Sequence, residues 1–413
     1  MKQNIQTLFE TGVQAANPAL AVRKELAHAP LAPNPSGRLI IIAIGKAATA
    51  MIQEALAHVP LGQSTEAIAV TNYENARDVT GCTVIAAGHP LPDENGLRAG
   101  TQIVELLQSS TVHDQVLCLI SGGGSALLPT PRDGLSLSDK IAVNDVLLGA
   151  GLDIVKMNAI RQQLSRLKGG GLTALAHPSP VRSLIVSDVV GDDLRAIASG
   201  PTASPIGGIS AIVSELKALG EWRKLPQTAQ TLIQTPRDVA LRDAENTLIC
   251  SNQHSLNAIA LAGRELQPHI MNDPLVGDVN QAAQTVIADA RKHLKGNCQL
   301  LIWGGETTVK LAGDGLGGRN QELALRVAEL GEQIGGEWQF LSGGTDGRDG
   351  PTDAAGGIVD RSTLSHANTN GLDVPAALQN NDSYHMLKQL DALLMTGATG
   401  TNVADIQLLL RIA

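Results

Sequence analysis

The chain has 413 residues, 43% of them hydrophobic, and its 40 acidic and 31 basic residues give a formal net charge of −9 at pH 7. This length is sufficient for two domains of ~150 residues each, and the negative charge argues against nucleic acid or an anionic membrane as a partner. Because only 2% of the residues are aromatic, we expect an aliphatic core and no stacking of surface aromatic residues on bases.

Short apolar runs of the length of buried parallel strands alternate along the chain with segments of helical periodicity. The apolar runs are 38–45, 67–71, 115–121, 182–187, 247–251 and 299–303, and the helical segments include 94–109, 138–150, 153–167, 252–266, 278–294 and 320–333. This alternation predicts an α/β protein with open, mostly parallel sheets covered by helices on both faces. The polar stretch 220–243 predicts a boundary between domains 1–240 and 241–413.

The cysteines and the apolar runs bear on the location of the protein. Cys82, Cys118, Cys250 and Cys298 form no CxxC pair and are expected to be buried, reduced thiols, which suits the cytoplasm. No apolar run reaches the ~18 residues of a membrane span. The first residues, MKQNIQTLFETGVQAANP, predict an amphipathic helix without a cleavage site.

Lys46 follows the apolar run RLIIIAIG, where a strand gives way to a helix. The surrounding residues form neither a Walker A loop nor a GxGxxG dinucleotide fingerprint. A solvated lysine would explain the residue without function. Its position at a strand end favours binding of a phosphate or a carboxylate.

The segment SGGGSALL, 121–128, predicts a strand, a glycine turn and the start of a helix. Backbone amides and a helix N-terminus bind anions in such an arrangement. The alternative is a tight turn without a ligand. The candidate binding residues are Ser121, Gly122, Gly123, Gly124 and Ser125.

The segment 153–172 reads as one helix stopped by glycines. At 100° per residue, Asn158, Arg161, Ser165 and Lys168 form a polar stripe. A solvated helix face explains this stripe as well as a face that binds an anion does. Asn158, Arg161 and Lys168 are candidates for substrate or nucleotide binding.

Acidic residues follow the strand predicted at 182–187. Asp188 stands directly at its C-terminal end, and Asp193 lies in the turn that follows. Ligands of α/β proteins bind at this end of the strands. A cap of the following turn is the structural alternative for Asp188.

The C-terminal half carries further charged residues in glycine-rich loops. Glu306 follows a predicted strand, and Arg319, a side chain suited to phosphate, precedes a predicted helix. Asp346, Asp349 and Asp353 lie in one loop whose spacing does not fit an EF-hand, although a Mg²⁺–nucleotide site needs only one or two carboxylates. The ten histidines show no HExxH spacing and no serine lies in a GxSxG elbow, which argues against a metallohydrolase or a serine hydrolase.

Taken together, these segments resemble the class II glycerate kinase family, whose C-terminal half is known as the MOFRL domain. The matching strings run in order from about residue 40 to residue 406, so nearly the whole chain is covered. They are GK at 45–46, SGGGSALL, KMNAIRQQLSRLKGGGLTALA, SDVVGDDLRAIASGPT, GGETTV, GGRNQELAL, GTDGRDGPTDAAGG and TGATGTNVADI. One departure is Ala398, where the family is expected to have proline.

The resemblance implies ATP-dependent phosphorylation of D-glycerate at O2, with Mg²⁺, in a cleft between a Rossmann-like N-terminal domain and a smaller α/β C-terminal domain. It implies Lys46, Arg319 and Asp188 as catalytic residues, and Asp188, Asp193 and Glu306 as carboxylates for the metal. Asp346, Asp353 and the glycine-loop and helix candidates would bind substrate or nucleotide. D-glycerate and ATP are the expected partners, and a homodimer is left open.

Two other functions remain open at this point. Relatives named hydroxypyruvate reductase suggest an NAD(P)H-dependent reductase, but such an enzyme should carry a GxGxxG turn with an acidic residue about twenty positions later, and no glycine cluster here has that arrangement. A non-catalytic protein that binds sugar acids or nucleotides would not need the set of lysine, arginine and carboxylate.

Overall fold

A computed structural model describes residues 4–412 except 33, 238–239, 241 and 296–297. The chain divides into two compact units, one formed by Pro18–Ile249 and the other by the residues from Cys250 onward together with those up to Asn17. We call them the N-terminal and the C-terminal domain and describe each by itself. Within the described residues, no helix is both long and apolar enough to cross a membrane.

The N-terminal domain is built on a six-stranded sheet with the order β3-β2-β1-β4-β5-β6. Its strands are β1 (Leu39–Ile44), β2 (Thr65–Asn72), β3 (Thr83–Ala87), β4 (Gln115–Ile120), β5 (Val181–Val186) and β6 (Glu245–Cys250). The pairs from β3 through β5 are parallel. This is the strand order of the doubly wound Rossmann fold, in which ligands bind where the order reverses, here between β1 and β4.

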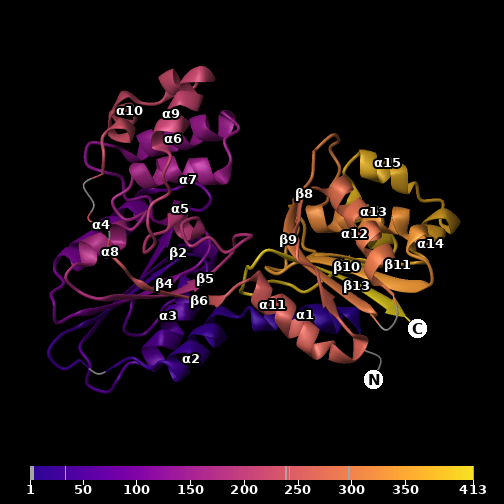
Figure 1. Ribbon diagram of the computed structural model, residues 1–413, viewed down its shortest axis with the longest axis horizontal. Helices are drawn as coiled ribbons and strands as arrows, with labels where there is room; N and C mark the ends of the chain where they lie inside the picture. The colour runs from indigo at the N-terminus through magenta and orange to yellow at the C-terminus, as the bar shows by residue number, and fades with distance from the viewer. Residues whose placement is uncertain (1–3, 33, 238–239, 241, 296–297, 413) are drawn as a thin grey trace. The chain divides into compact units, whose positions relative to one another are not determined.

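Helices cover both faces of this sheet (Figure 1). Every residue of β1 is buried, which explains its continuous apolar sequence. Ile42 and Val70 share one core cluster with Ile103 and Leu107 of α4, whereas α3 packs on β1, β2 and β4. The helices are α2 (Pro18–His28), α3 (Ala48–Ala57), α4 (Glu94–Gln108) and α8 (Gly171–Ala176).

A group of helices forms a second, smaller core in the same domain. They are α6 (Leu137–Gly149), α7 (Ile154–Gln163), α9 (Ile209–Ala218) and α10 (Gln227–Gln234). Leu147, Ile160, Leu216, Trp222 and Ile233 are buried together there. The other three helices pack on α7. This helix carries two of the candidate binding residues, Asn158 and Arg161.

The C-terminal domain contains a mixed sheet with the order β12-β11-β10-β13-β9-β7, and β8 also pairs with β9. Its strands are β7 (His269–Ile270), β8 (Leu275–Asp278), β9 (Leu300–Thr308), β10 (Glu337–Gly344), β11 (Gly356–Asp360), β12 (Leu393–Leu394) and β13 (Asp405–Ile412). The last strand, β13, lies between β9 and β10 and is antiparallel to both. The expectation of mostly parallel sheets is therefore wrong for this domain, because the final strand inserts into the middle of the sheet.

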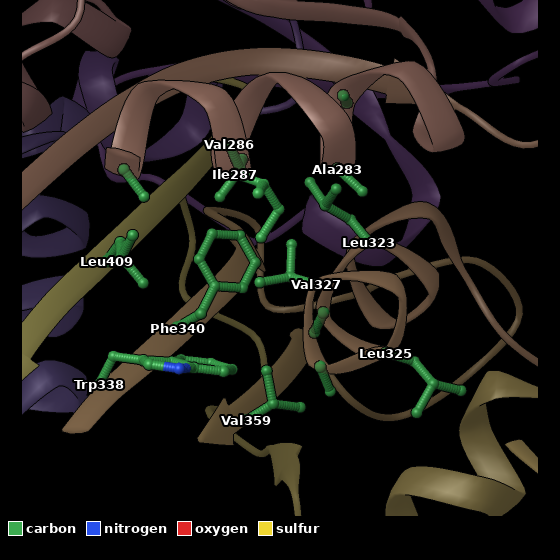
Figure 2. Close-up of a cluster of buried hydrophobic side chains, with 14 of the residues drawn as sticks. Ala283, Val286, Ile287, Leu323, Leu325, Val327, Trp338, Phe340, Val359 and Leu409 are labelled. Atoms are coloured by element: carbon green, nitrogen blue, oxygen red, sulfur yellow. The ribbon is translucent and has the colours of Figure 1, made fainter. Parts of the chain in front are cut away.

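The two faces of this mixed sheet are covered by different pairs of helices. One pair is α1 (Ile5–Ala15) and α11 (Asn252–Ala262), and the other is α12 (Val279–His293) and α13 (Arg319–Leu330). Phe9 of α1 is buried with Ile259 of α11 and Leu408 of β13. On the opposite face, Phe340 of β10 lies beneath Val286 and Ile287 of α12 (Figure 2). The short helices α14 (Thr363–Thr369), α15 (Val374–Gln379) and α16 (Ser383–Gln389) complete the domain.

Each of the six predicted strands is present, and the predicted α/β class with a Rossmann-like first domain is confirmed. The helix expected over 153–167 is present only in part, because α7 ends at Gln163. The chain turns there to pair with another segment, since Ser165 forms a bridge with Pro131 and Arg166 donates its backbone N–H to the Thr130 carbonyl. The first helix belongs to the C-terminal domain, whereas the expected boundary assigned it to domain 1–240.

We predict that Phe340→Ala lowers the free energy of unfolding of the C-terminal domain by ~3–5 kcal/mol, because the fully buried ring would leave a cavity. Urea unfolding followed by fluorescence or circular dichroism measures this change. Leu311→Ala in the same domain is the control, since Leu311 is 79% exposed. Equal effects of the two substitutions would contradict the assignment of Phe340 to this core.

Candidate active site

Lys46 and the glycine turn after β4 meet at the point where the strand order reverses. The Lys46 backbone N–H donates to the Gly122 carbonyl over 2.9 Å, and the Ala47 N–H donates to Ser121 Oγ over 3.1 Å. Gly45 has a φ of +120°, and a Cβ there would lie 2.4 Å from the Ser121 carbonyl oxygen. Glycine is therefore required for the ends of β1 and β4 to approach this closely.

Asp188 follows β5 and lies against the same glycine turn. A Cβ on Gly122 would stand 2.0 Å from Asp188 Oδ2, so only glycine leaves room for this carboxylate. Burial raises the pKa of Asp188, and the Lys46 ammonium opposes that shift. The structure thus brings together two of the predicted catalytic residues, a partly buried carboxylate and a lysine, at the ligand-binding edge of the sheet.

The helix predicted after the glycine turn is only α5 (Gly124–Leu127). One turn of helix has a weak dipole, so the expected helix N-terminus contributes little to anion binding. Ser121 is buried and its hydroxyl is engaged with the backbone of β1. Ser125 contacts Ser199 through their hydroxyl oxygens at 2.7 Å, and Ser199 donates to Asn158 Oδ1.

A pocket of about 190 Å³ adjoins this turn and contains three cationic side chains. They are Lys140 of α6, Arg161 of α7 and Lys168 from the turn that follows α7. Lys140 Nζ donates to the Pro129 carbonyl over 2.6 Å, and Lys168 Nζ donates to the adjacent Leu128 carbonyl over 2.7 Å. Two ammonium groups are thus fixed by consecutive carbonyls of one segment.

Arg161 is held in the same pocket by amide side chains. Its guanidinium donates to Asn158 Oδ1 and to Asn144 Oδ1.

Burial lowers the pKa of Arg161. Burial also lowers the pKa of Lys168 well below the ordinary lysine value, and the charges of Lys140 and Arg161 add to this shift. Burial and the charge of Arg161 also lower the pKa of Lys140 to about 7. Burial is thus the main cause of all three shifts, and repulsion between the cations adds to those of the two lysines.

His89 connects this pocket to Lys46. A Cβ on Gly123 would lie 3.2 Å from the His89 ring and 3.2 Å from Lys46 Cγ, so both side chains flank Gly123. Burial and the charge of Lys46 lower the pKa of His89. The lysine, the carboxylate and the cationic pocket therefore form one continuous region of the N-terminal domain.

In the C-terminal domain, Arg319 begins α13 and is anchored by a buried carboxylate. Its Nε donates to Asp405 Oδ2 over 2.6 Å, and its Nη2 donates to Asp405 Oδ1 over 2.9 Å. Glu306 Oε1 lies 3.2 Å from Arg319 Nη1. These carboxylates raise the pKa of Arg319, so the guanidinium keeps its charge and a fixed orientation.

Asp349 caps the N-terminus of α13. Its Oδ1 accepts from the Asn320 N–H over 3.1 Å and its Oδ2 from the Gln321 N–H over 2.8 Å. Burial raises the pKa of Asp349 to about 6 despite these bonds. Asp349 and Asp405 together fix the position from which Arg319 projects.

The other predicted carboxylates have partners of their own. Asp193 forms an ion pair with Arg195 at 2.7 Å, and Asp353 accepts from the Tyr384 hydroxyl over 2.8 Å. Asp346 accepts from the Arg348 N–H. The described residues contain no cluster of three or more His, Cys, Asp or Glu side chains with the geometry of a metal site. The roles of Asp193, Glu306, Asp346 and Asp353 in metal or substrate binding stay predictions.

Sequence reasoning missed Lys140, Asn144, His89 and Asp405. Lys140 lies on a helix that was expected at 138–150, but nothing local distinguishes it from a solvated lysine. Asp405 directly precedes the run IQLLL, but a position at the start of a strand does not indicate that it lies beside Arg319. The antiparallel insertion of β13 places it beside the strand that carries Glu306.

Comparisons with known proteins agree with this architecture. Residues 4–234 match a domain of unknown function (DUF4147), and residues 299–405 match the MOFRL family. Glycerate 2-kinase of Pyrococcus horikoshii is 37% identical to this chain over 388 residues, which cover 90% of this chain and 86% of the relative. The chain belongs to the class II glycerate kinase family.

Other members of the class II glycerate kinase family extend the comparison. The crystal structure of glycerate kinase from Thermotoga maritima matches with a TM-score of 0.90 and 35% identity, and covers 98% of each chain. A protein of Agrobacterium vitis with the provisional name hydroxypyruvate reductase is 38% identical and covers 91% of this chain and 99% of the relative. Both names therefore occur among relatives of similar identity, and the name alone does not decide the reaction.

Proposed function

We propose that the protein is a kinase that phosphorylates D-glycerate at O2 and yields 2-phosphoglycerate and ADP. The observation that carries this proposal is the Lys46–Asp188 pair at the reversal point of the sheet, beside a pocket of three cations. Phosphoryl transfer needs this combination, because catalysis consists mainly of positioning anionic reactants and neutralising their charge. The glycerate 2-kinase names of relatives along nearly the whole chain support the same reaction.

In this proposal, the O2 hydroxyl of D-glycerate attacks the terminal phosphorus of ATP, the P–O bond to ADP breaks and the hydroxyl loses its proton. Lys46 stabilises the charge on the transferring phosphoryl group. Asp188 faces the same region, and its raised pKa brings its basicity closer to that of a general base. Two roles remain for this carboxylate, acceptance of the proton or binding of the metal.

The residues fit a Mg²⁺–ATP substrate. Mg²⁺ needs only one or two protein carboxylates because phosphates and waters complete its shell, and the Asp188 carboxylate lies against Gly122, which has no side chain to block it. When bound, Mg²⁺ would neutralise charge on the phosphates. Asp188 would bind the metal. Asp193 would bind it only if the ion pair between Asp193 and Arg195 were broken.

Arg319 is proposed as a second cation for the phosphoryl group. Asp405 holds its Nε and Nη2, whereas its Nη1 contacts Glu306, a side chain that is 46% exposed. A phosphate that displaces Glu306 would gain a charge-assisted hydrogen bond from Nη1. The location of the active site between the two domains, a cytoplasmic location and a homodimer stay predictions.

Hydroxypyruvate reductase is the second candidate, because the Agrobacterium vitis relative bears that name. In this chain, the turn after β1 reads Gly45-Lys46-Ala47 and lacks the second glycine with which a dinucleotide fold admits the pyrophosphate. The turn instead carries a lysine side chain. The observations therefore favour the kinase.

We predict that ADP release by the purified protein requires both D-glycerate and Mg²⁺, and that enolase consumes the product directly. Phosphoglycerate mutase is left out of the coupled assay, because 2-phosphoglycerate is the substrate of enolase and 3-phosphoglycerate is not. A product that enolase accepts only after mutase is added would place the phosphate on O3. Oxidation of NADH with hydroxypyruvate, without ADP release from glycerate, would favour the reductase.

We predict that Lys46→Ala and Arg319→Ala each lower kcat by roughly 10²-fold or more, because a preorganised cation on the phosphoryl group supplies several kcal/mol in the transition state. Steady-state kinetics at saturating substrates measures the effect. Lys24→Ala is the control, since this exposed lysine lies on α2. A variant with a wild-type kcat would remove that residue from the mechanism.

We predict that Asp188→Asn folds normally and is nearly inactive, because the amide keeps the size of the carboxylate but neither accepts a proton nor binds Mg²⁺ well. Recovery of part of the rate at high Mg²⁺ would identify metal binding as the lost function. Inactivity at every Mg²⁺ concentration would indicate the base. If the variant is fully active at low Mg²⁺, Asp188 only caps the following turn.

A further inference from the structure

The cationic pocket combines three charged groups with an apolar wall. Its charged groups are Lys140, Arg161 and Lys168, and the rest of its wall is largely proline and aliphatic, including Pro90, Pro129, Val143 and Leu164. The side chain of Lys168 is buried, with a residue exposure of 3%. Among the described residues, no carboxylate forms an ion pair with any of the three.

One buried and two half-buried cations without a counter-ion are costly. Each is nevertheless held by neutral acceptors, the Leu128 and Pro129 carbonyls and the two asparagine amides. These acceptors occupy only part of the donor capacity, because an ammonium has three N–H groups and a guanidinium has five. All three side chains line the same pocket, so a small anion bound there could accept from their remaining donors.

The size of the pocket selects among anions. About 190 Å³ is less than the ~300–1,000 Å³ of pockets that hold drug-sized ligands, so the size favours a small acid over a nucleotide. A three-carbon acid fits, with its carboxylate among the cations. The apolar wall would cover its carbon chain, and the lining includes Ser125 and Gly123 of the glycine turn.

We propose that this pocket binds the carboxylate of the acceptor hydroxy acid, with Arg161 as its bidentate partner and Lys140 and Lys168 as the flanking cations. The inference rests on the proposed function for the identity of the acid. It assigns acceptor recognition to α6, α7 and the turn after α7, and it adds Lys140 as a specificity residue. The phosphates of ATP would then bind elsewhere, at Lys46 and the glycine turn.

The pocket predicts a pH dependence of acceptor binding. The groups that face Lys140 are Arg161, Lys168, His89 and the Pro129 carbonyl, and the pKa of Lys140 is about 7. Lys140 is charged below this pH and neutral above it, so the KM for the acid should rise as the pH increases through 7. His89 titrates below its usual pKa of 6.5, which separates its effect from that of Lys140.

The test compares D-glycerate with D-glyceramide, which has the same hydroxyl groups but no charge. For Arg161→Met, we expect kcat/KM for D-glycerate to fall by roughly 10- to 100-fold, the range for loss of hydrogen bonds to a charged group. The KM for ATP and the kcat/KM for D-glyceramide should change by less than about 3-fold, a difference within ordinary context effects. Lys140→Met should reduce the rise in KM above pH 7.

Lys156→Met is the matched control, because Lys156 lies on the same helix but pairs with Glu215 at 2.9 Å outside the pocket. Arg161→Lys should retain part of the preference for the acid, which a merely structural role would not produce. Urea unfolding of each variant verifies the fold. Equal losses with D-glycerate and D-glyceramide, or a rise in the KM for ATP, would overturn the assignment and place a phosphate in the pocket.

Calorimetric titration of D-glycerate without nucleotide separates this inference from the proposed function. Binding that is lost in Arg161→Met would support the pocket even if no phosphoryl transfer occurs, and the proposed function alone would then fail. If the enzyme phosphorylates D-glycerate but Arg161→Met retains the full preference over D-glyceramide, the reaction stands and the pocket assignment fails.

Discussion

The close approach of β1 and β4 at their C-terminal ends determines the geometry of the N-terminal site. The hydrogen bond from the Lys46 N–H to the Gly122 carbonyl joins the two turns at 2.9 Å. It requires Gly45 in a positive-φ conformation, and it leaves Gly122 as the surface on which the Asp188 carboxylate lies. A side chain at either glycine would separate the strands or expel the carboxylate, so lysine and aspartate depend on the same backbone contact.

The C-terminal domain orients its cation in a different way. Arg319 is held by the buried Asp405 and presents its remaining N–H groups, whereas the N-terminal pocket holds its cations with neutral carbonyls and amides. A carboxylate partner keeps Arg319 charged but reduces its net attraction for an anion. Neutral partners do not offset the charges of Lys140, Arg161 and Lys168, and burial together with the charge of Arg161 lowers the pKa of Lys140 as a result.

Residues at strand ends could be predicted from the sequence, and residues brought in by tertiary packing could not. Lys46 and Asp188 follow apolar runs, and the rule that ligands bind at the carboxyl ends of parallel strands was enough to select them. Lys168 was selected through a helix that ends before it, at Gln163, and reaches the pocket through a turn instead. Lys140 comes from a separate helix whose periodicity contains no sign of the pocket. Asp405 depends on the antiparallel insertion of the last strand, which strand propensity does not reveal.

The contribution of the first helix to the C-terminal core bears on how the chain reaches its folded state. Phe9 and Ile5 of α1 are buried with Ile259, Leu341 and Leu408, residues that are synthesised more than two hundred positions later. The N-terminal domain is therefore inserted in the sequence of the C-terminal domain, between α1 and the residues from Cys250 onward (Figure 1). During synthesis, α1 leaves the ribosome before α11 and β13, the elements that its apolar face packs against. The inserted domain can fold in the interval, and its compactness shortens the loop that α1 must close to meet its partners.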